Sequence, residues 1–500
     1  MNIIERDIVL KKGKEFRNRR VLIVGMARSG VAAAALANEI GAVVTITDTK
    51  KREELGDVLS PLAGTGICEA PGEDGTARVK DSDLVMISPG VPLNAPVVRE
   101  AERLGIPVTG ELEFASVLCP CEYAAVTGTN GKTTTVTLLY NLFRSLGYPC
   151  GLLSTIANYV GEKRLETANT TADPITINSL LGEMVEAGCA YCFMEVSSIG
   201  VEQDRVTGLK FKAGIFSNLT HDHLDYHKTF AEYLRCKKLF FDNLPADAWA
   251  IINIDDKHGR VMVQNTRAKV VTYSCRSIAD HTCRIMEESF EGMQLRIDGR
   301  ETWTRLIGQH NAYNLLAIYT TAILVGASEE EALVALSNLS SACGRLETIR
   351  GPHDLTAVID YAHTPDALEN VLKTLKDISC GRQIICLFGC GGDRDRTKRP
   401  EMAKVAAQYA DRIIVTSDNS RTERTEDIMD DIRAGFSRED AARVLYISDR
   451  KEAIRTAILT APDGACILLA GKGHETYQII GTEKRHFDER EIVNDVFKTL

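Results

Sequence analysis

The sequence predicts an α/β protein of about three domains, and three observations lead to that prediction. Its 500 residues exceed what one or two hydrophobic cores of ordinary size accommodate. Short apolar runs, typical of buried strands, alternate with longer segments of helical periodicity along most of the chain. Many of these runs end in loops rich in Gly, Asp, Ser, Arg or His, as in parallel sheets whose carboxyl edge carries a binding site.

The first unit begins with a strand–turn–helix–strand pattern. Residues 21–24 are apolar and are followed by the turn 25–30, an Ala-rich helical segment and a second apolar run, 42–47. Such a βαβ unit predicts a Rossmann-like fold, although Ala27 stands where the dinucleotide fingerprint has its middle glycine. The pattern leaves three interpretations open: a nicotinamide dinucleotide site, a uridine nucleotide site on the same scaffold, or a turn that binds nothing. A further strand, 84–87, also ends in a Gly-bearing loop.

A second unit opens on residues 126–135, which read Val-Thr-Gly-Thr-Asn-Gly-Lys-Thr-Thr-Thr. An apolar run leads into this stretch and a helical pattern follows it, so strand, turn and helix predict a phosphate cradle. Gly128 and Gly131 permit the turn. Lys132 can reach the outer phosphates of a nucleotide, and the Thr133 hydroxyl can hold Mg²⁺. The spacing is shorter than in the common NTPase motif. We predict a P-loop ATPase-like domain, and a Gly-rich turn with an incidental lysine is the alternative.

Acidic and histidine-rich loops follow two later strands of this unit. Glu195 ends the apolar run 191–194, where a carboxylate beside a P-loop is a natural Mg²⁺ ligand; a helix N-cap cluster is the alternative. Residues 221–227 contain three His and two Asp, which suit Mg²⁺ and phosphate, Zn²⁺, or plain solvation. Lys237 lies in the predicted helix 231–240 and, taken alone, is a surface lysine.

A third unit begins near residue 343 and again alternates strands with helices. Before it, residues 267–305 predict peripheral β-structure. Four strands of the third unit end in polar loops, and we expect these loops to share one cleft because the carboxyl ends of parallel strands converge. The four strands cover residues 357–359, 384–388, 413–416 and 466–469. We predict a second Rossmann-like domain here. The domain limits that we expect are 1–117, 118–341 and 342–500.

Composition limits the classes of function. The chain is 44% hydrophobic and 26% charged with a net charge of −10, which is typical of a globular protein and disfavours nucleic-acid or anionic-membrane binding. The N-terminus has no apolar signal segment, and no run of 18 apolar residues occurs. The 14 Cys follow no disulfide framework, so we interpret them as buried reduced thiols rather than metal half-sites. We therefore expect a cytoplasmic monomer without membrane or nucleic-acid partners.

The order and form of the motifs resemble those of the Mur ligases, ATP-dependent amide-forming enzymes of peptidoglycan synthesis. The resemblance covers nearly the whole chain. Residues 120–500 look most like the members that add the third residue of the stem peptide. Residues 20–117 resemble instead the N-terminal domain of the members that add D-glutamate, whose Rossmann-like fold holds uridine diphosphate. The motifs that carry the resemblance lie at 126–135, 218–227, 360–365, 389–400 and 471–478.

The resemblance implies a reaction as well as a fold. A substrate carboxylate attacks the γ-phosphate of ATP to give an acyl phosphate, and an incoming amine displaces the phosphate. The implied product forms from meso-2,6-diaminopimelate and UDP-N-acetylmuramoyl-L-alanyl-D-glutamate. Addition of D-glutamate to UDP-N-acetylmuramoyl-L-alanine, or of L-lysine as the third residue, is the alternative. A non-catalytic nucleotide-binding or scaffold protein fits less well because the catalytic motif residues are intact, and the loops at 389–400 and 418–421 disfavour a folylpolyglutamate synthetase.

The family's functional residues have counterparts in this chain. The implied catalytic residues are Lys132, Glu195, His223 and Lys237. Mg²⁺ would be held by Thr133, Glu195, His223 and Lys237, the last as its carbamate, N6-carboxylysine. ATP would meet Gly128, Thr129, Asn130, Gly131, Lys132, Thr133, Thr134, Asn311, Asn314, Arg345, Asp360 and His363. The UDP-muramoyl peptide would meet Arg28, Ser29, Asp48, Thr49, Ser88 and Gly90 at its uridine end, and Asn169, Thr170, Thr171, Ser197, Gln203 and Arg205 in the central domain. The amino acid would meet Arg394, Asp418, Asn419, Arg421, Gly471 and Glu475.

Charge matching gives the implied amino-acid pocket a physical reason. Diaminopimelate carries a second amine and a second carboxylate at its far end. Arg421 can bind a carboxylate bidentately, and Glu475 can pair with an ammonium. L-Lysine lacks that carboxylate and would leave Arg421 unpaired. Two positions depart from the family pattern: Ser420 replaces a proline, which should loosen its loop, and Ile199 replaces a histidine.

Overall fold

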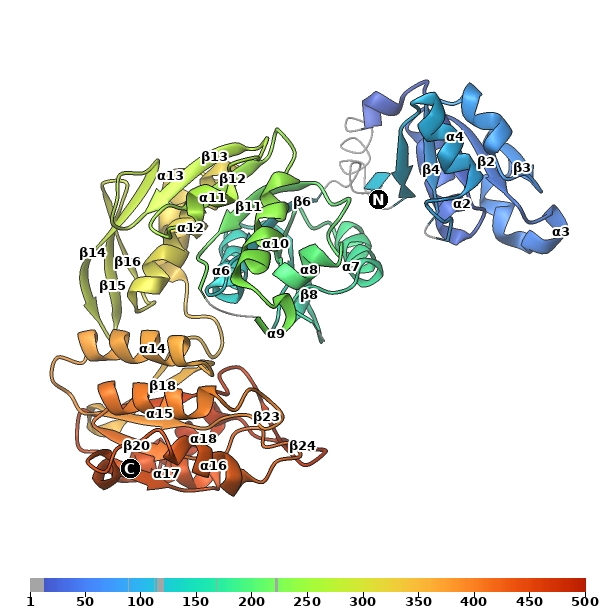
Figure 1. Ribbon diagram of the computed structural model, residues 1–500. Coiled ribbons are helices and arrows are strands. Elements are labelled where there is room, and N and C mark those ends of the chain that lie inside the picture. Colours follow the sequence, from blue (N-terminus) through green and yellow to red (C-terminus); the bar gives the residue numbers. More distant parts are fainter. Residues whose placement is uncertain (1–12, 89, 112, 115–120, 168, 221–223) are drawn as a thin grey trace.

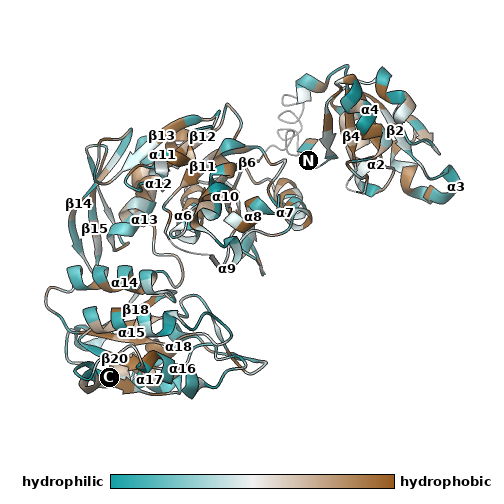
Figure 2. Cartoon of the chain, in the orientation of Figure 1, coloured by the Kyte–Doolittle hydropathy of each residue, from teal (hydrophilic) through white to brown (hydrophobic). Residues whose placement is uncertain are grey.

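Three separate β-sheets organise the chain in the computed structural model, as Figure 1 shows. The structure describes residues 13–88, 90–111, 113–114, 121–167, 169–220 and 224–500. Each sheet is mainly parallel and is covered by helices, which confirms the predicted α/β class with three units. Brown, apolar segments lie along the strands and the helix faces turned toward them in Figure 2, with teal residues outside.

The first sheet has the strand order β3-β2-β1-β4-β5, with all neighbours parallel. This order confirms the predicted Rossmann-like βαβ start. Its elements are β1 (Arg20–Val24), α2 (Arg28–Glu39), β2 (Val43–Asp48), α3 (Arg52–Leu55), β3 (Cys68–Pro71), β4 (Leu84–Ile87), α4 (Pro96–Leu104) and β5 (Val108–Gly110). The carboxyl ends of β1, β2 and β4 are neighbours, so the loops that follow them share one edge of the sheet.

The central sheet has eleven strands, and β6 lies between β10 and β11 in parallel register. Its parallel part consists of β6 (Glu122–Thr127), α6 (Lys132–Ser145), β7 (Cys150–Leu153), α7 (Pro174–Glu186), β10 (Tyr191–Glu195), α8 (Ser198–Glu202), β11 (Phe211–Phe216), α9 (Leu224–His227), α10 (Phe230–Asp242), β12 (Trp249–Asn253), α11 (Gly259–Met262) and β13 (Lys269–Ser274). Its remaining elements are β8 (Asn158–Val160), β9 (Lys163–Leu165), β14 (His281–Ser289), β15 (Gly292–Ile297), β16 (Arg300–Thr304), α12 (Gln309–Leu324) and α13 (Glu329–Asn338).

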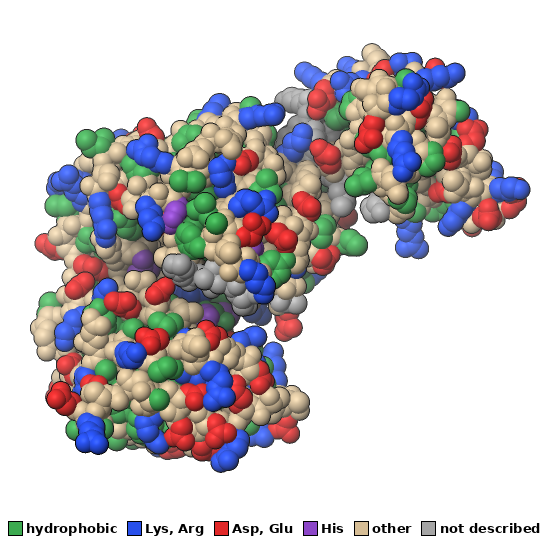
Figure 3. All heavy atoms as spheres, in the orientation of Figure 1, with side chains coloured by type: hydrophobic (Ala, Val, Ile, Leu, Met, Phe, Trp, Pro, Cys, Tyr) green, Lys and Arg blue, Asp and Glu red, His purple; other side chains and the backbone are tan. Residues whose placement is uncertain are grey.

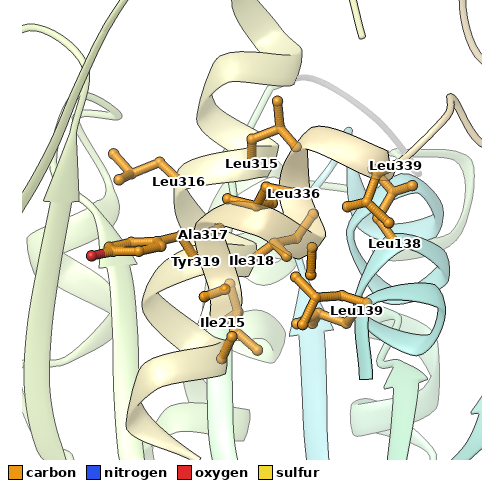
Figure 4. Close-up of a cluster of buried hydrophobic side chains, with 14 of the residues drawn as sticks. Leu138, Leu139, Ile215, Leu315, Leu316, Ala317, Ile318, Tyr319, Leu336 and Leu339 are labelled. Carbon is orange, nitrogen blue, oxygen red and sulfur yellow. The ribbon is translucent and has the colours of Figure 1, made fainter. Parts of the chain in front are cut away.

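A dense apolar core fixes α6, and with it the P-loop, against the central sheet. Figure 4 shows Leu138 and Leu139 of α6 facing α12 and α13, with Ile215 of β11 beside them. These three side chains are fully buried, as is Ile318 of α12. Each such side chain contributes about 1.5–3 kcal/mol through burial. The core therefore holds the start of α6 in one place relative to the strand ends.

The third sheet has the order β17-β18-β22-β19-β20-β21, and β18, β22, β19 and β20 are parallel neighbours. The four predicted strand-end loops therefore do meet at one edge. The elements are β17 (Glu347–Arg350), β18 (Thr356–Asp360), α14 (Pro365–Ile378), β19 (Ile384–Phe388), α15 (Lys398–Tyr409), β20 (Arg412–Val415), α16 (Thr425–Arg433), β21 (Val444–Tyr446), α17 (Arg450–Leu459), β22 (Cys466–Ala470) and α18 (Glu489–Phe497). A separate hairpin is formed by β23 (Tyr477–Ile480) and β24 (Glu483–His486).

The β14–β15 hairpin joins the central unit to the C-terminal unit. Residues 267–305 are β-structure as predicted, but they are not merely peripheral, because Phe290 at the hairpin tip belongs to the hydrophobic core of the C-terminal sheet. The guanidinium groups of Arg350 and Arg382 lie 5.8 Å and 5.6 Å from the centre of its ring. Glu291 next to it pairs with Arg350. The two units thus share one packed joint.

Candidate functional site

The P-loop turn lies between β6 and α6, at the carboxyl edge of the central sheet. Gly131 takes a left-handed conformation with φ +86°, and a Cβ there would lie 2.5 Å from Asn314 Oδ1. Glycine adopts this turn without strain, so α6 can begin directly after it. Lys132 Nζ donates to the carbonyls of Gly128 at 2.8 Å and Thr129 at 2.9 Å. The lysine is therefore folded over the loop that would hold phosphates.

The loop that follows β11 supports the P-loop. Asn218 accepts from Asn130 N with its side chain at 2.9 Å and from Thr129 N with its backbone carbonyl at 2.8 Å. Ser217 Oγ donates to the Asn130 carbonyl at 2.7 Å. The sequence placed Asn218 in a motif but gave it no role in the site. Its position after a buried strand next to the P-loop was the available signal.

Two oxygen ligands suited to Mg²⁺ lie next to the P-loop. Glu195 ends β10 and stands opposite Val126 in the parallel register with β6. Glu195 Oε1 accepts from Thr155 N at 2.8 Å, whereas Oε2 is buried and has no hydrogen-bond partner among the described residues. Because a buried carboxylate oxygen without a partner is costly, a cation would complete this site. Thr133 lies in the first turn of α6, and His223 falls outside the described residues.

Lys237 is buried beside the P-loop, so the simple interpretation of a surface lysine is wrong. Its side chain on α10 is 1% exposed. Lys237 Nζ donates to the Gly128 carbonyl at 2.8 Å and to Thr127 Oγ1 at 3.4 Å, and it lies 5.0 Å from the centre of the Tyr233 ring. A buried ammonium needs such partners. Helix α10 thus delivers a nitrogen to the same loop that Lys132 contacts.

Helix α12 brings two buried asparagines to the P-loop. Asn314 Nδ2 donates to Asn311 Oδ1 at 3.1 Å, and Thr135 Oγ1 donates to Asn314 Oδ1 at 3.4 Å. Asn311 Nδ2 donates to the Ile307 carbonyl at 2.7 Å. The predicted ATP residues of the central unit therefore form one connected group around α6. Thr134 is also buried there.

Three further residues predicted to meet ATP lie at the start of the C-terminal unit. The Arg345 guanidinium lies 5.0 Å from the centre of the Tyr361 ring, and His363 Nδ1 is 2.8 Å from the Tyr361 carbonyl oxygen. The Asp360 carboxylate accepts from two backbone N–H groups, including Leu346 N at 2.7 Å, and burial raises the pKa of Asp360. Figure 3 shows histidine and basic side chains along the hollow between the central and C-terminal units.

The central residues predicted to meet the UDP-muramoyl peptide form a connected network near Glu195. Thr171 Oγ1 donates to the Glu195 carbonyl and to Ser197 Oγ, both at 3.1 Å. Arg205 Nη1 donates to the Thr171 carbonyl at 2.6 Å and Arg205 Nε to Gln203 Oε1 at 3.0 Å. Thr170 joins through a 3.1 Å hydrogen bond from Thr155, and Asn169 precedes it on an exposed turn. Ile199 is half-buried beside this network.

The residues predicted for the uridine end lie together at the carboxyl edge of the first sheet. Asp48 ends β2 and accepts from Met26 N at 2.8 Å, which ties it to the turn after β1. Ser88 follows β4 and donates to the buried carboxylate of Glu111. Thr49 and Gly90 are exposed in neighbouring loops. Arg28 and Ser29 open α2 and are exposed.

The predicted amino-acid residues lie at the carboxyl edge of the third sheet. Asp418 and Asn419 follow β20, and Gly471 follows β22. Gly471 has φ +113°, and a Cβ there would lie 2.7 Å from Asp418 Oδ2. Glu475 Oε2 accepts from Asn419 Nδ2 at 2.9 Å. Glycine at 471 therefore leaves room for the Asp418 carboxylate, and Asn419 links the Glu475 carboxylate to the same loop.

Two arginines lie at the same edge of the third sheet. Arg421 Nη1 donates to the Gly392 carbonyl at 2.7 Å, and Arg421 has φ +49°, a conformation that non-glycine residues rarely adopt. Arg394 is exposed in the β19–α15 loop. A Cβ on Gly391 would lie 3.1 Å from Arg421 Nη1 and 3.8 Å from Arg394 Cγ, so both side chains pass that backbone. Carboxylates and guanidinium groups together suit a zwitterionic ligand.

The loop with Ser420 is held by structure that the sequence did not predict. Ser420 is 3% exposed. Arg421 N donates to the Ile479 carbonyl at 3.3 Å, and Gly481 N donates to the Arg421 carbonyl at 2.8 Å, so the β23–β24 hairpin clasps the loop. Gln478 Nε2 donates to the Asp418 carbonyl at 3.0 Å. The expected loosening at Ser420 is thereby countered.

Comparison with known proteins agrees with the architecture. The Mur ligase middle domain matches residues 126–322, the Mur ligase glutamate ligase domain matches residues 344–473, and the MurD-like N-terminal domain matches residues 19–110. The last match confirms the prediction that the first unit resembles the N-terminal domain of the D-glutamate-adding Mur ligases.

Curated relatives match over most of their length. A UDP-N-acetylmuramoyl-L-alanyl-D-glutamate–2,6-diaminopimelate ligase of Cytophaga hutchinsonii is 47% identical over 447 residues, 89% of either chain. An enzyme of the same name from Phocaeicola vulgatus is 53% identical over 377 residues, which cover 75% of this chain and 78% of that one.

Solved structures agree as well. A structure of a ligase with the same name is 30% identical, with a TM-score of 0.59 and coverage of 97% and 93% of the two chains. A UDP-N-acetylmuramate–alanine ligase from Thermotoga maritima, 17% identical with a TM-score of 0.53, shares the fold. The three α/β units, the P-loop in the central one and the matches to relatives together identify the class of protein as an ATP-dependent ligase. The chain belongs to the Mur ligase family.

The family uses ATP and Mg²⁺. Glu195 Oε2, which is buried and has no hydrogen-bond partner among the described residues, suits a Mg²⁺ ligand. No helix in the described part of the chain is long and apolar enough to span a bilayer. The described cysteines are free thiols, and no group of three potential metal ligands of the His, Cys, Asp and Glu types occurs among the described residues.

The Gly131→Ala variant should lose ATP binding. The added methyl group would lie 2.5 Å from Asn314 Oδ1, so it must displace either the P-loop or the Asn314 amide, which is hydrogen-bonded to Thr135 and Asn311. Gly147→Ala is the matched control, because Gly147 has φ +89° at the other end of α6 but nothing lies within 4 Å of its Cβ. Both variants should lose about 1–2 kcal/mol of unfolding free energy from the left-handed backbone. Calorimetric ATP titration should show a loss for Gly131→Ala alone, and equal ATP affinity in both variants would contradict the assignment.

Proposed function

We propose that this chain joins meso-2,6-diaminopimelate to UDP-N-acetylmuramoyl-L-alanyl-D-glutamate with ATP, through an acyl phosphate, during synthesis of the peptidoglycan precursor. The observation that carries the proposal is the cluster of opposite charges at the carboxyl edge of the third sheet, where Glu475, Arg421 and Asp418 all act electrostatically on Tyr477 and Glu475 is hydrogen-bonded to Asn419. Opposite charges in one pocket suit a substrate with two amines and two carboxylates. The names of the curated relatives support the same reaction.

The central unit supplies the phosphoryl-transfer half of this proposal. Lys132 and the turn around Gly131 would hold the ATP phosphates. Thr133 and Glu195 would hold one Mg²⁺, which would neutralise charge on the phosphate oxygens. His223 stays a proposed ligand of a second ion. The network around Thr171 and Ser197 would place the substrate carboxylate, because it begins at the backbone of Glu195.

We also propose that Lys237 acts as its carbamate, N6-carboxylysine. Its neutral amine would add CO₂ and release one proton, giving a carboxylate beside the P-loop. The support is the burial of the nitrogen 2.8 Å from the Gly128 carbonyl, which would place the carboxylate formed from CO₂ beside the loop proposed to hold the phosphates and Mg²⁺.

The remaining expectations also stay proposals. We propose that the protein works as a cytoplasmic monomer on small-molecule substrates, in agreement with its free thiols. The domain limits 1–117, 118–341 and 342–500 remain our proposal as well, and each range contains one of the three sheets. The first range would hold the uridine nucleotide through the loops after β1, β2 and β4.

An ADP-release assay tests the reaction. The enzyme is given ATP and UDP-N-acetylmuramoyl-L-alanyl-D-glutamate with meso-diaminopimelate, with L-lysine, or with neither, and in parallel UDP-N-acetylmuramoyl-L-alanine with D-glutamate. We expect ADP release with diaminopimelate alone. The D-glutamate reaction is included because the first unit matches the MurD-like N-terminal domain. Turnover in that reaction alone would overturn the proposal.

Arg421→Ala should weaken diaminopimelate selectively. Loss of a charge-assisted contact to the far carboxylate should raise the KM for diaminopimelate about 10- to 100-fold, with the KM for ATP nearly unchanged. The preference for diaminopimelate over L-lysine should narrow by the same factor. Arg424→Ala, which removes a 75% exposed arginine three residues later, is the control and should leave all constants unchanged. Equal effects on ATP and diaminopimelate would remove Arg421 from the pocket.

Lys237→Ala should be nearly inactive and should recover part of its activity in the presence of a short-chain carboxylic acid such as acetate. The added acid would replace the carboxylate of the carbamate in the cavity left by the side chain. Lys238→Ala serves as the control, because Lys238 is the next residue on α10 and pairs with Asp242 at 2.7 Å. Activity in Lys237→Ala without acid, or failure of every short acid to restore any, would count against the carbamate.

A further inference from the structure

Two fully buried cations lie under the amino-acid pocket, and the family resemblance assigned neither of them a role. Lys472, between Gly471 and the hairpin, has a 0% exposed side chain. Arg450 on α17 is equally buried and pairs with Glu489 of α18, also 0% exposed, at 2.8 Å. Burying a charge is costly unless every partner is in place, so the contacts of these two cations define what they hold.

Lys472 touches two residues of the proposed pocket. Its Nζ donates to Glu475 Oε2 at 2.9 Å and to Asn419 Oδ1 at 3.2 Å. Asn419 Nδ2 donates to the same Glu475 oxygen at 2.9 Å, which closes a triangle. Tyr477 and Phe487 place their rings 5.7 Å and 5.9 Å from the ammonium and exclude water from it.

This triangle leaves one carboxylate oxygen for a ligand. Both hydrogen bonds to Glu475 end on Oε2, and among the described residues Oε1 has no partner. Asn419 Oδ1 is in turn occupied by Lys472 and by Ile479 N at 2.9 Å. The side chain of Asn419 is therefore committed to holding Glu475, and Glu475 Oε1 is the atom that remains for an ammonium.

Arg450 supports the second carboxylate from below. Its Nη1 donates to the Ser417 carbonyl at 3.1 Å and its Nη2 to the Ala470 carbonyl at 2.8 Å. These are the residues just before Asp418 and Gly471, so one guanidinium ties the ends of β20 and β22 together. Asp418 Oδ1 accepts from Asn419 N at 2.6 Å, and Oδ2 faces Gly471.

We propose that Lys472 is a positioning residue for the amino-acid pocket: it fixes Glu475 and Asn419 so that Glu475 Oε1 receives an ammonium group of the incoming diamino acid. Arg450 plays the corresponding part for Asp418 by setting the spacing of the two strand ends. The proposal rests on the proposed function, and it explains why a lysine stands between two glycines in a loop that binds a substrate of partly positive charge. Lys472 does not meet the substrate itself.

The same cations bear on the charge of Asp418. Burial opposes its ionisation, but Lys472 and then Arg450 outweigh burial and leave the pKa of Asp418 lowered. The titratable and charged groups that face it are Lys472, Arg450, His363, Tyr361, Tyr477 and Cys390. Above its lowered pKa, Asp418 is ionised and can bind an ammonium group of diaminopimelate. This binding is lost as the pH falls through the pKa of Asp418. Removal of Lys472 should therefore move the acid limb of kcat/KM for diaminopimelate to higher pH.

The test compares Lys472→Met, Glu475→Gln and the double variant with the wild-type full-length enzyme. Lys472→Met should raise the KM for diaminopimelate about 10- to 100-fold, the range for one charge-assisted hydrogen bond, and change the KM for ATP less than about twofold. If Lys472 acts through Glu475, the double variant should bind diaminopimelate no worse than Glu475→Gln at a pH well above the acid limb, where Asp418 is ionised in every variant. Arg443→Met is the control, because Arg443 also donates to two backbone carbonyls, those of Ala407 and Ala410, but away from the pocket.

Each outcome bears on the proposal. An unchanged KM for diaminopimelate in Lys472→Met, an equal rise in both KM values, an unshifted acid limb, or additive losses in the double variant would overturn it. If Lys472→Met does not fold by circular dichroism, the comparison of Glu475→Gln with the double variant, in which both charges are removed together, still decides. Absence of turnover by the wild-type enzyme with diaminopimelate would overturn the proposed function and this inference with it, whereas normal wild-type turnover isolates a failure of the inference.

Discussion

The parallel pairing of β6 with β10 and β11 is the constraint on which the central site depends. It places the P-loop, Glu195 and the loop with Asn218 at one edge, with Glu195 directly opposite Val126. No side chain has to reach across the sheet to form this group. The same rule orders the third sheet, where β18, β22, β19 and β20 present four loops side by side. The parallel strand direction therefore brings together both the residues proposed for phosphoryl transfer and those proposed for amino-acid binding.

Buried charge then gives the edge of the third sheet a defined polarity. Lys472 and Arg450 are enclosed under Asp418 and Glu475. A charge inside a protein interacts more strongly than one at the surface because the effective dielectric constant is lower. A buried charged side chain also cannot rotate into solvent. These cations therefore hold carbonyl and carboxylate oxygens in fixed positions at a cost that the apolar cores described above must offset.

Much of this could be predicted from the sequence, and the remainder has an identifiable cause. Residues 126–135 and the four polar strand ends were recognisable because local periodicity and turn chemistry reveal them. The burial of Lys237 could not be predicted from the residues alone, because the sequence of an amphipathic helix does not show which neighbouring element covers its lysine. The ion pair Arg450–Glu489 joins residues 39 apart in the sequence, and the hydrogen bonds between Arg421 and the β23–β24 hairpin join residues about 60 apart. Such long-range partners leave no local pattern.

The β14–β15 hairpin has a consequence for how such a chain can be assembled from parts. Phe290 belongs to the core of the C-terminal sheet, so the two later units cannot be separated without opening a hydrophobic cluster. Among the described residues, the clusters of the first sheet contain no residue beyond Phe114. Exchange of the first unit would thus open none of these clusters, whereas exchange of either later unit alone would open the cluster that contains Phe290. This asymmetry permits the combination found here: a MurD-like N-terminal unit joined to central and C-terminal units similar to those of diaminopimelate-adding ligases.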